Sequence, residues 1–363
     1  MNAIPKFEPA DFASDQEVRW CPGCGDYSIL KSVQRTLSQI GASRENTVCV
    51  SGIGCSSRFP YYIETYGYHT IHGRAPAIAT GVKLANPELD VWIVTGDGDG
   101  LSIGGNHMLH LLRRNLDCQV LLFNNEIYGL TKGQYSPTSR FGTRSPSTPF
   151  GSVDRPLNPC GFALGAGARF VARSYDLAQA RTPEVLARAH AHRGASFVEI
   201  YQNCIVYNDA AFERFASKKA GANAQLWLEN GKPMLFAKGT KGLRLNRETL
   251  RLEVVSVADQ DAAAADILIH DETNRTIAQL LIEMPFGDFP VALGVIYCDP
   301  ALASFESAVV EQSRKAAAGK KRDLNALLRK GDTWSVEVDD GASKKAHHRR
   351  YSLRNNASSG YLR

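Results

Sequence analysis

Residues 91–125 read VWIVTGDGDGLSIGGNHMLHLLRRNLDCQVLLFNN, and this stretch decides the fold. The apolar run 91–95 predicts a buried strand that ends abruptly at a Gly-Asp-Gly-Asp turn, and residues 104–115 have the apolar spacing of a helix. A second apolar run, 120–123, predicts the next strand, with a pair of asparagines at its tip. A strand–helix–strand unit of this length makes the two strands parallel, so both tips lie at the same edge of the sheet.

Two side chains with oxygen ligands are therefore expected to meet at this edge, the carboxylate of Asp97 and the amide of Asn125. Mg²⁺ prefers hard oxygen ligands in octahedral geometry, completed by phosphate oxygens and water. Gly96 and Gly98 would let backbone N–H groups approach a phosphate. The pairing resembles the diphosphate–metal motif of thiamine-diphosphate enzymes, and this resemblance implies the carbonyl of Ile127 as a third protein ligand to the metal.

Cysteines form a second group of candidate ligands. Cys21 and Cys24 lie in a CPGCG segment, while Cys55 and Cys204 each follow a predicted strand. Four thiolates can hold a [4Fe–4S] cluster or a structural zinc ion, and the spacing alone leaves both open. Cys55 adjoins the segment expected to contact the diphosphate, and a carbanion-forming cofactor benefits from an electron acceptor, so the cluster is favoured over zinc and over disulfides. The other four cysteines are expected to be packed thiols: Cys49, Cys118, Cys160 and Cys298.

The remaining patterns favour an α/β fold, a doubly wound and mostly parallel sheet, and the resemblance to thiamine-diphosphate enzymes implies that it is of the type that binds this cofactor. Helices are predicted at 28–40, 77–86, 161–168 and 183–192, and further strands at 47–51 and 197–203. Alternating strands and helices predict helices on both faces of the sheet, with ligands at the carboxyl ends of the strands. Gly54, Asp97, Asn125 and Cys204 all fall at such ends. The loop 131–160 is too long for a mere connection and is expected to be functional.

Three segments are expected: a cofactor-binding domain at 1–210, an appended subdomain at 211–305 and a basic arm at 306–363. The second would contain two hairpins, at 226–236 and 243–257. The net charge of +5 comes from the end of the chain, because the residues from 311 onward hold 13 Lys and Arg against 6 Asp and Glu. This run is interpreted as a solvated or partner-binding arm, since it has neither interleaved aromatics nor a fold that recognises nucleic acid.

Nothing in the chain predicts export or a membrane span. The first residues lack a charged start and an apolar core, and no apolar run is long enough to cross a bilayer. Eight cysteines without export features fit a reducing, cytoplasmic location.

Five motifs carry a family resemblance: CPGCG, IGCSSR, HGRAPAIATGVKLANP, GDGDGLSIGGNH and NNEIYGLTKGQYSPTS. Over about residues 12–210 the chain resembles the β subunits of 2-oxoacid:ferredoxin oxidoreductases, most of all those of the 2-oxoglutarate type. The resemblance implies thiamine diphosphate, Mg²⁺ and a [4Fe–4S] cluster held by Cys21, Cys24, Cys55 and Cys204.

It also implies contacts and roles for particular residues. Arg58 would face the substrate carboxylate, and His72 would contact the cofactor and take part in catalysis. The cofactor contacts it implies are Ile53, Gly54, Cys55, Ser56, His72, Gly73, Arg74, Gly96, Asp97, Gly98, Asp99, Asn125, Gly129 and Leu130.

The implied reaction is the oxidative decarboxylation of 2-oxoglutarate with coenzyme A to succinyl-CoA and CO₂, or its reverse, with electrons passing through the cluster to ferredoxin. This chain shows no counterpart of the glutamate that activates the aminopyrimidine ring. An α subunit is expected to supply that glutamate, most of the substrate pocket and the coenzyme A site, in an α₂β₂ heterotetramer.

Three alternatives stay open at this point. The substrate could be pyruvate or another 2-oxoacid, or the chain could be a non-redox thiamine-diphosphate decarboxylase or lyase with a structural Cys₄ zinc site. A non-catalytic scaffold is the third, and the intact Asp97, Asn125 and four cysteines argue against it.

Overall fold

The computed structural model describes residues 7–257, 266–319 and 323–331. The chain divides into two compact units, Met1–Arg314 and Lys315–Arg363. The first contains the sheet and every candidate site residue.

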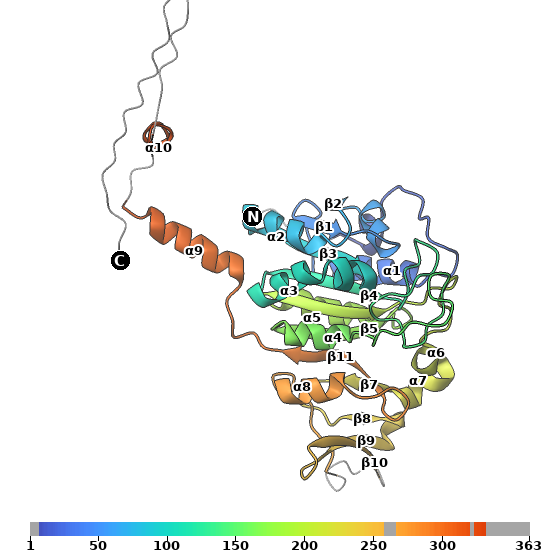
Figure 1. Ribbon diagram of the computed structural model, residues 1–363. Helices are drawn as coiled ribbons and strands as arrows, with labels where there is room; N and C mark the ends of the chain where they lie inside the picture. The colour runs from blue at the N-terminus through green and yellow to red at the C-terminus, as the bar shows by residue number, and fades with distance from the viewer. Residues whose placement is uncertain (1–6, 258–265, 320–322, 332–363) are drawn as a thin grey trace, which may run out of the picture. The chain divides into compact units, whose positions relative to one another are not determined.

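An eight-stranded sheet forms the centre of the first unit, in the order β2-β1-β3-β4-β6-β5-β11-β7 (Figure 1). Its strands are β1 Thr47–Ser51, β2 Tyr66–His69, β3 Asp90–Gly96, β4 Cys118–Asn124, β5 Phe170–Tyr175, β6 Ala195–Tyr201, β7 Gln225–Leu228 and β11 Val291–Cys298. The first six strands of this order run parallel, whereas β11 is antiparallel to β5 and parallel to β7. The predicted mostly parallel α/β sheet is confirmed.

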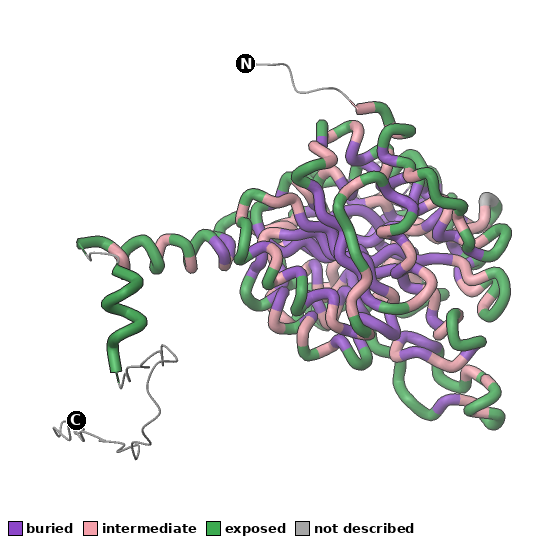
Figure 2. The backbone as a smooth tube through the Cα atoms, turned by 90° about the horizontal axis from the view of Figure 1, so that it is seen from above, coloured by how far each residue is buried: buried purple, intermediate pink, exposed green. Residues whose placement is uncertain are grey.

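Helices cover both faces of the sheet. One face carries α1 Asp26–Gln39 and α5 Thr182–Ala191, and the other carries α2 Ala75–Ala85, α3 Gly105–Arg114, α4 Pro159–Gly165 and α8 Arg275–Ile282. The strands alternate accordingly, because Val91 and Ile93 join one core while Trp92 and Val94 join the other. The strands consequently form the most deeply buried part of the chain, as the purple tube in Figure 2 shows.

Residues 211–305 differ from the expected pair of hairpins. The second hairpin is confirmed, since β9 Lys241–Asn246 and β10 Arg251–Ser256 are antiparallel and join β8 Leu235–Phe236 in a small sheet. The first is wrong, because β7 pairs in parallel with β11 instead of turning back on β8. Segments on both sides of residue 210 thus share the central sheet, and the boundaries at 210 and 305 stay predictions.

The shorter elements complete the described chain. They are the 3₁₀ helices Pro9–Phe12, Ser56–Tyr61 and Ala237–Gly239, a π-helical turn Asp99–Ile103, and the helices α6 Glu213–Ala216, α7 Lys218–Ala224, α9 Phe305–Ala317 and α10 Leu324–Leu328. The sequence patterns do not predict β2 or β5.

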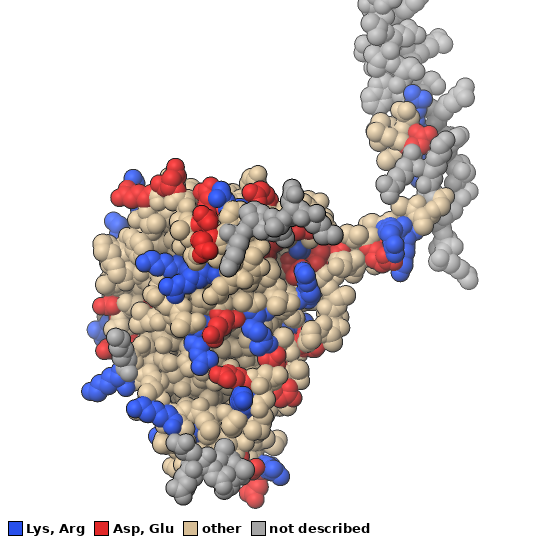
Figure 3. All heavy atoms as spheres, turned by 180° about the vertical axis from the view of Figure 1, so that it is seen from behind, with Lys and Arg blue, Asp and Glu red and all other residues tan. Residues whose placement is uncertain are grey.

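Charged side chains are spread over the surface of the described part of the chain. Acidic and basic side chains are interspersed over the face of the molecule seen in Figure 3. Helices in the described part of the chain are all too short or too polar to cross a membrane. The basic segment 344–354 lies outside the described residues.

Candidate active site

Asp97 lies just past the end of β3, at the carboxyl edge of the sheet, and is 2% exposed. The hydroxyl of Thr138 donates to its Oδ2 over 2.6 Å. Burial raises the pKa of Asp97, and no Lys, Arg or His within the described ranges forms an ion pair with it. A buried carboxylate with only hydroxyl and backbone partners is a suitable ligand for a divalent cation, whose charge would hold it ionised.

The turn after β4 is held against the turn of Asp97. The hydroxyl of Tyr128 donates to the carbonyl of Gly98 over 3.1 Å, and a Cβ added at Gly98 would lie 2.2 Å from the Tyr128 ring. Asn125 donates from Nδ2 to Gln202 and accepts at Oδ1 from the backbone N–H of Ile127, 3.2 Å away. The structure therefore brings the two predicted turns into contact, and ligation by Asn125 and Ile127 stays a prediction.

Asp99 connects three loops at this edge. Its Oδ1 accepts from the backbone N–H groups of Ile53 at 3.0 Å and Gly73 at 2.7 Å, and it lies 2.6 Å from His72 Nδ1. Its Oδ2 accepts from the hydroxyl of Thr95 over 2.6 Å. The predicted diphosphate loops are thus fixed to one buried carboxylate, and the side chain of Asp99 is engaged with protein donors.

The two residues with predicted catalytic roles lie at the surface of this edge. The side chain of His72 is 37% exposed and turned toward Asp99. Arg58 follows Cys55 in a 3₁₀ helix and donates from Nη1 to the carbonyl of Arg19 over 2.9 Å. Both roles stay predictions.

The CPGCG segment is anchored beside the end of β6. The backbone N–H of Gly25 donates to the carbonyl of Asn203 over 3.2 Å, and a Cβ added at Gly25 would lie 2.1 Å from Asp176 Oδ2. The Nε2 group of Gln202 donates to Cys24 Sγ over 3.3 Å. A glycine is therefore required at position 25, because it lets the segment with Cys21 and Cys24 approach Cys204.

The structure brings the four predicted cysteines into one group. A Cβ added at Gly129 would lie 3.5 Å from Cys204 Sγ and 3.6 Å from Cys55 Sγ. Burial, together with the charges of Asp26, Cys204 and Cys21, raises the pKa of Cys55 to about 12. Burial, Asp26, Cys55 and Cys204 likewise raise the pKa of Cys24. In contrast, Cys49, Cys118 and Cys160 are buried in the core, as packed thiols.

Three polar residues of the site are missed by the sequence reasoning. Thr138 donates to Asp97, Gln202 contacts both Asn125 and Cys24, and Thr95 supports Asp99. Thr138 lies in the long loop 131–160, whose length is the signal that marks it as functional.

Known proteins resemble this chain in sequence and in fold. Residues 52–200 match the family described as thiamine pyrophosphate enzyme, C-terminal TPP binding domain. The chain is 49% identical over 339 residues to the "2-oxoglutarate oxidoreductase subunit KorB" of Mycobacterium tuberculosis, covering 90% of this chain and 88% of that one. It is 42% identical over 201 residues to the "2-oxoglutarate synthase subunit KorB" of Archaeoglobus fulgidus, covering 55% of this chain and 75% of the relative.

A solved structure extends the likeness to the fold. The 2-oxoglutarate:ferredoxin oxidoreductase from Magnetococcus marinus, determined with 2-oxoglutarate, coenzyme A and succinyl-CoA bound, superposes with a TM-score of 0.73 at 30% identity. The match covers 92% of this chain and 98% of that one. The fold and these relatives together define a thiamine-diphosphate enzyme of the oxidoreductase class. The chain belongs to the family of β subunits of 2-oxoacid:ferredoxin oxidoreductases, so the resemblance found in the sequence is confirmed.

Proposed function

We propose that this chain is the β subunit of a 2-oxoglutarate:ferredoxin oxidoreductase that holds thiamine diphosphate, Mg²⁺ and a [4Fe–4S] cluster. The reaction is the coenzyme A-dependent oxidative decarboxylation of 2-oxoglutarate to succinyl-CoA and CO₂, or its reverse. One observation carries the proposal: Cys55 belongs to the same loop as Ile53, so the thiol group and the predicted diphosphate site share a single short segment.

The residues at the sheet edge fit a metal diphosphate. Asp97 is buried without a cationic partner among the described residues, and Gly98 allows no side chain beside Tyr128. Asp97, Asn125 and the carbonyl of Ile127 would hold Mg²⁺, and the loops fixed by Asp99 would present backbone N–H groups to the phosphates. When bound, thiamine diphosphate supplies the electron sink for decarboxylation. The protein's own part is to neutralise, orient and desolvate the diphosphate.

The thiols fit a cluster better than zinc. A zinc ion draws its ligands to about 2.3 Å from one point. Within the parts of the chain that the structure describes, no three His, Cys, Asp or Glu side chains gather closely enough for a single ion. Cys204 nevertheless lies close enough to both Cys24 and Cys55 to raise their pKa values, and Cys21 lies close enough to Cys55 to do the same there. A [4Fe–4S] cluster needs four thiolates that surround it, each binding a different iron, so the thiolates do not converge on one point.

The substrate-facing part of the proposal rests on two half-buried side chains, Arg58 and His72. Arg58 presents a guanidinium group suited to a carboxylate, and His72 is oriented by Asp99. The glutamate that activates the aminopyrimidine, the coenzyme A site and most of the substrate pocket are assigned to an α subunit. We place the enzyme in the cytoplasm as an α₂β₂ heterotetramer that reduces ferredoxin.

The test is anaerobic. The chain is purified with the subunit that co-elutes, its iron and acid-labile sulfide are measured, and EPR spectra are recorded before and after addition of 2-oxoglutarate. A substrate-dependent radical or a reduced [4Fe–4S] signal is expected. A signal with pyruvate alone would keep the chemistry and change the substrate, whereas zinc without iron would point to a non-redox thiamine-diphosphate enzyme.

A further inference from the structure

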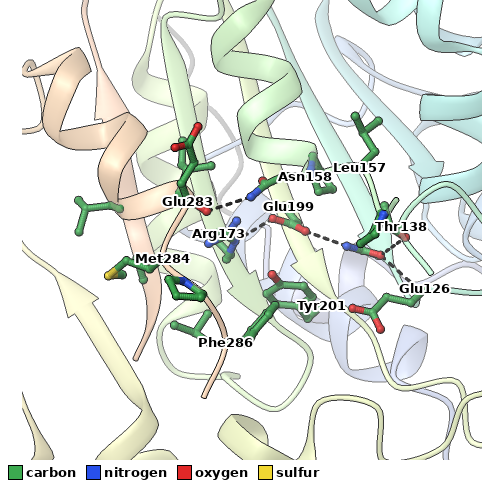
Figure 4. Close-up of a pocket in the computed structure, with 18 of the residues that line it drawn as sticks. Glu126, Thr138, Leu157, Asn158, Arg173, Glu199, Tyr201, Glu283, Met284 and Phe286 are labelled. Carbon is green, nitrogen blue, oxygen red and sulfur yellow. Dashed lines mark hydrogen bonds and ion pairs between the residues drawn. The ribbon is translucent and has the colours of Figure 1, made fainter. Parts of the chain in front are cut away.

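A cavity of about 300 Å³ opens beside the carboxyl ends of β4, β5 and β6 (Figure 4). Its polar side is formed by residues of these strands and of the loop 131–160, and its apolar side by the segment that follows α8. The volume is at the lower end of the range for small-molecule pockets. None of the predicted cofactor or cluster residues lines it.

Three guanidinium groups border this cavity. Arg173 lies deepest, 5% exposed, and donates from Nε to Glu199 over 2.8 Å. Arg140 and Arg214 lie at its rim, where burial and then the charge of Arg140 lower the pKa of Arg214, while the charge of Glu126 acts in the opposite direction. Two neighbouring cations at a cavity rim repel each other, and an anion bound beside Glu126 would relieve that repulsion further.

The carboxylates of the cavity are already engaged by the protein. Glu199 accepts from Arg173 and, at 2.8 Å, from Asn124 Nδ2. Glu126 lies 3.1 Å from Arg140 Nε, and Glu283 accepts from Gln279.

The guanidinium groups, in contrast, retain unused donors. Each carries five N–H donors and no acceptor. In the described chain the hydrogen bond of Arg173 to a carboxylate is made by Nε, and Arg214 makes no hydrogen bond or ion pair. The cavity's three arginines are matched in number by its glutamates Glu126, Glu199 and Glu283, but it offers surplus N–H donors, which a ligand with acceptor oxygens would satisfy.

An apolar wall faces these donors. Met284 and Phe286 also line the cavity, and the guanidinium carbon of Arg214 lies 3.6 Å from the centre of the Phe286 ring. This stacking fixes the orientation of the guanidinium group while leaving its N–H edge available.

We propose that this cavity binds a small amphipathic anion, a carboxylate or phosphate on an apolar or aromatic body. The anionic group is held by Arg173 and the two rim arginines, and the body packs against Met284 and Phe286. The site is separate from that of the diphosphate, with Thr138 between the cavity and Asp97. It does not depend on the proposed function, because no residue that defines it is a proposed ligand of metal, diphosphate or cluster.

Isothermal titration calorimetry of the full chain with its co-eluting subunit tests the proposal, with thiamine diphosphate and Mg²⁺ present in saturating amounts. The probes are phenyl phosphate, benzoate, inorganic phosphate and the neutral benzyl alcohol. We expect saturable binding of phenyl phosphate or benzoate, at least tenfold tighter than inorganic phosphate, and none of benzyl alcohol. The tighter of the two aromatic anions identifies the preferred headgroup.

Variants locate the binding. Arg214→Gln removes a largely exposed side chain and should weaken the aromatic anion at least tenfold, and Met284→Glu, which places a carboxylate in the wall, should abolish binding. The control is Arg193→Gln, a side chain 87% exposed and outside this cavity, which should bind as the unmodified protein does. Circular dichroism confirms that each variant is folded.

Three results would overturn the proposal. They are the absence of saturable binding by any anion, undiminished binding in folded Arg214→Gln, and inorganic phosphate binding as tightly as the aromatic anions. The EPR result with 2-oxoglutarate has no bearing on these outcomes, so failure of either proposal is recognised separately.

Discussion

Asp97 is the residue whose removal most directly tests the metal site. Asp97→Ala should lower the Mg²⁺-dependent affinity for thiamine diphosphate by about a hundredfold, since a charged ligand interaction is worth on the order of 3 kcal/mol. Its carboxylate is buried and unpaired by any cation in the described chain, so its loss removes a charge without exposing a partner. Fluorescence titration with the cofactor, with and without EDTA, measures the change.

The exposed Asp15→Ala is the matched control and should bind as the unmodified protein does. Unchanged affinity in Asp97→Ala would mean that the metal lies elsewhere.

Cys204 and Cys160 offer a paired test of the thiol group. Cys204→Ser should reduce bound iron severely and abolish the [4Fe–4S] spectrum, because Cys204 lies with Cys55 beside Gly129. Cys160→Ser should retain the iron, because that thiol is in the core, 3.2 Å from Glu199. Iron analysis and absorption spectra of anaerobic preparations measure the cluster content of both variants. An equal loss of iron in Cys204→Ser and Cys160→Ser would refute the choice of ligands.

At the scale of elements, Asp99 is the residue that holds the loops of the site in one arrangement. Asp99→Asn keeps the size but loses charge, and its amide would face donors from Ile53, Gly73 and Thr95. We expect a loss of about 1–3 kcal/mol of unfolding free energy together with weaker cofactor binding. Urea denaturation and cofactor titration measure the two effects.

Asp154→Asn is the comparison, because that carboxylate accepts from the exposed hydroxyl of Tyr135 and should tolerate the change. A stable Asp99→Asn variant with weak cofactor binding would assign Asp99 to the cofactor rather than to the loops.

Local sequence predicts some of the helices and strands correctly and others incorrectly. The strands β3 and β4 and the helix between them follow from apolar periodicity, which depends on neighbouring residues only. The pairing of β7 does not follow from local sequence, because its partner strand, β11, lies more than sixty residues further along the chain. The Asn230-Gly231 turn, expected to close a hairpin, instead donates from Gly231 N–H to the carbonyl of His270.

The same limit applies to the site. Asp97 and the cysteines are marked by motif and spacing. Thr138 carries no periodic signal, and its contact with Asp97 is created only by the fold of the long loop. Within β5, the polar Arg173 interrupts the apolar pattern, and only its pairing with Glu199 explains its burial.

At the scale of the whole molecule, two buried histidines each make a contribution to stability that depends on pH. Burial lowers the pKa of His192, although Asp117 and Asp299 act in the opposite direction. Burial also lowers the pKa of His270, whose Nε2 lies 2.9 Å from the carbonyl of Val295. Both are neutral in the fold, whereas unfolding lets them take up protons near their ordinary pKa of 6.5.

The unfolded state therefore binds more protons below pH 6.5. The stability that the two neutral histidines contribute is fully present above pH 6.5, and it is lost as the pH falls from 6.5 to their lowered pKa values. Each histidine contributes up to about 1.4 kcal/mol per pH unit in that window. The carboxyl groups of Asp26 and Glu126, whose burial raises the pKa of each to about 7, act in the opposite direction. Denaturant titrations between pH 5 and 8 should therefore show the histidine contribution as the difference between the unmodified protein and His192→Gln, whose unfolding free energy should rise less with pH. A slope that is unchanged in His192→Gln but reduced in the less buried His107→Gln would contradict the assignment.

The position of β11 between β5 and β7 also means that the central sheet can be completed only late in synthesis. When β6 has left the ribosome, the outer edge of β5 has no neighbour until residue 298 is translated, about 5–20 s later at usual rates of synthesis. During that interval the nascent chain presents a row of unpaired backbone groups to other chains. A message that stops before codon 291 should therefore yield aggregates instead of a smaller soluble protein, and chaperone demand should fall sharply once β11 has emerged.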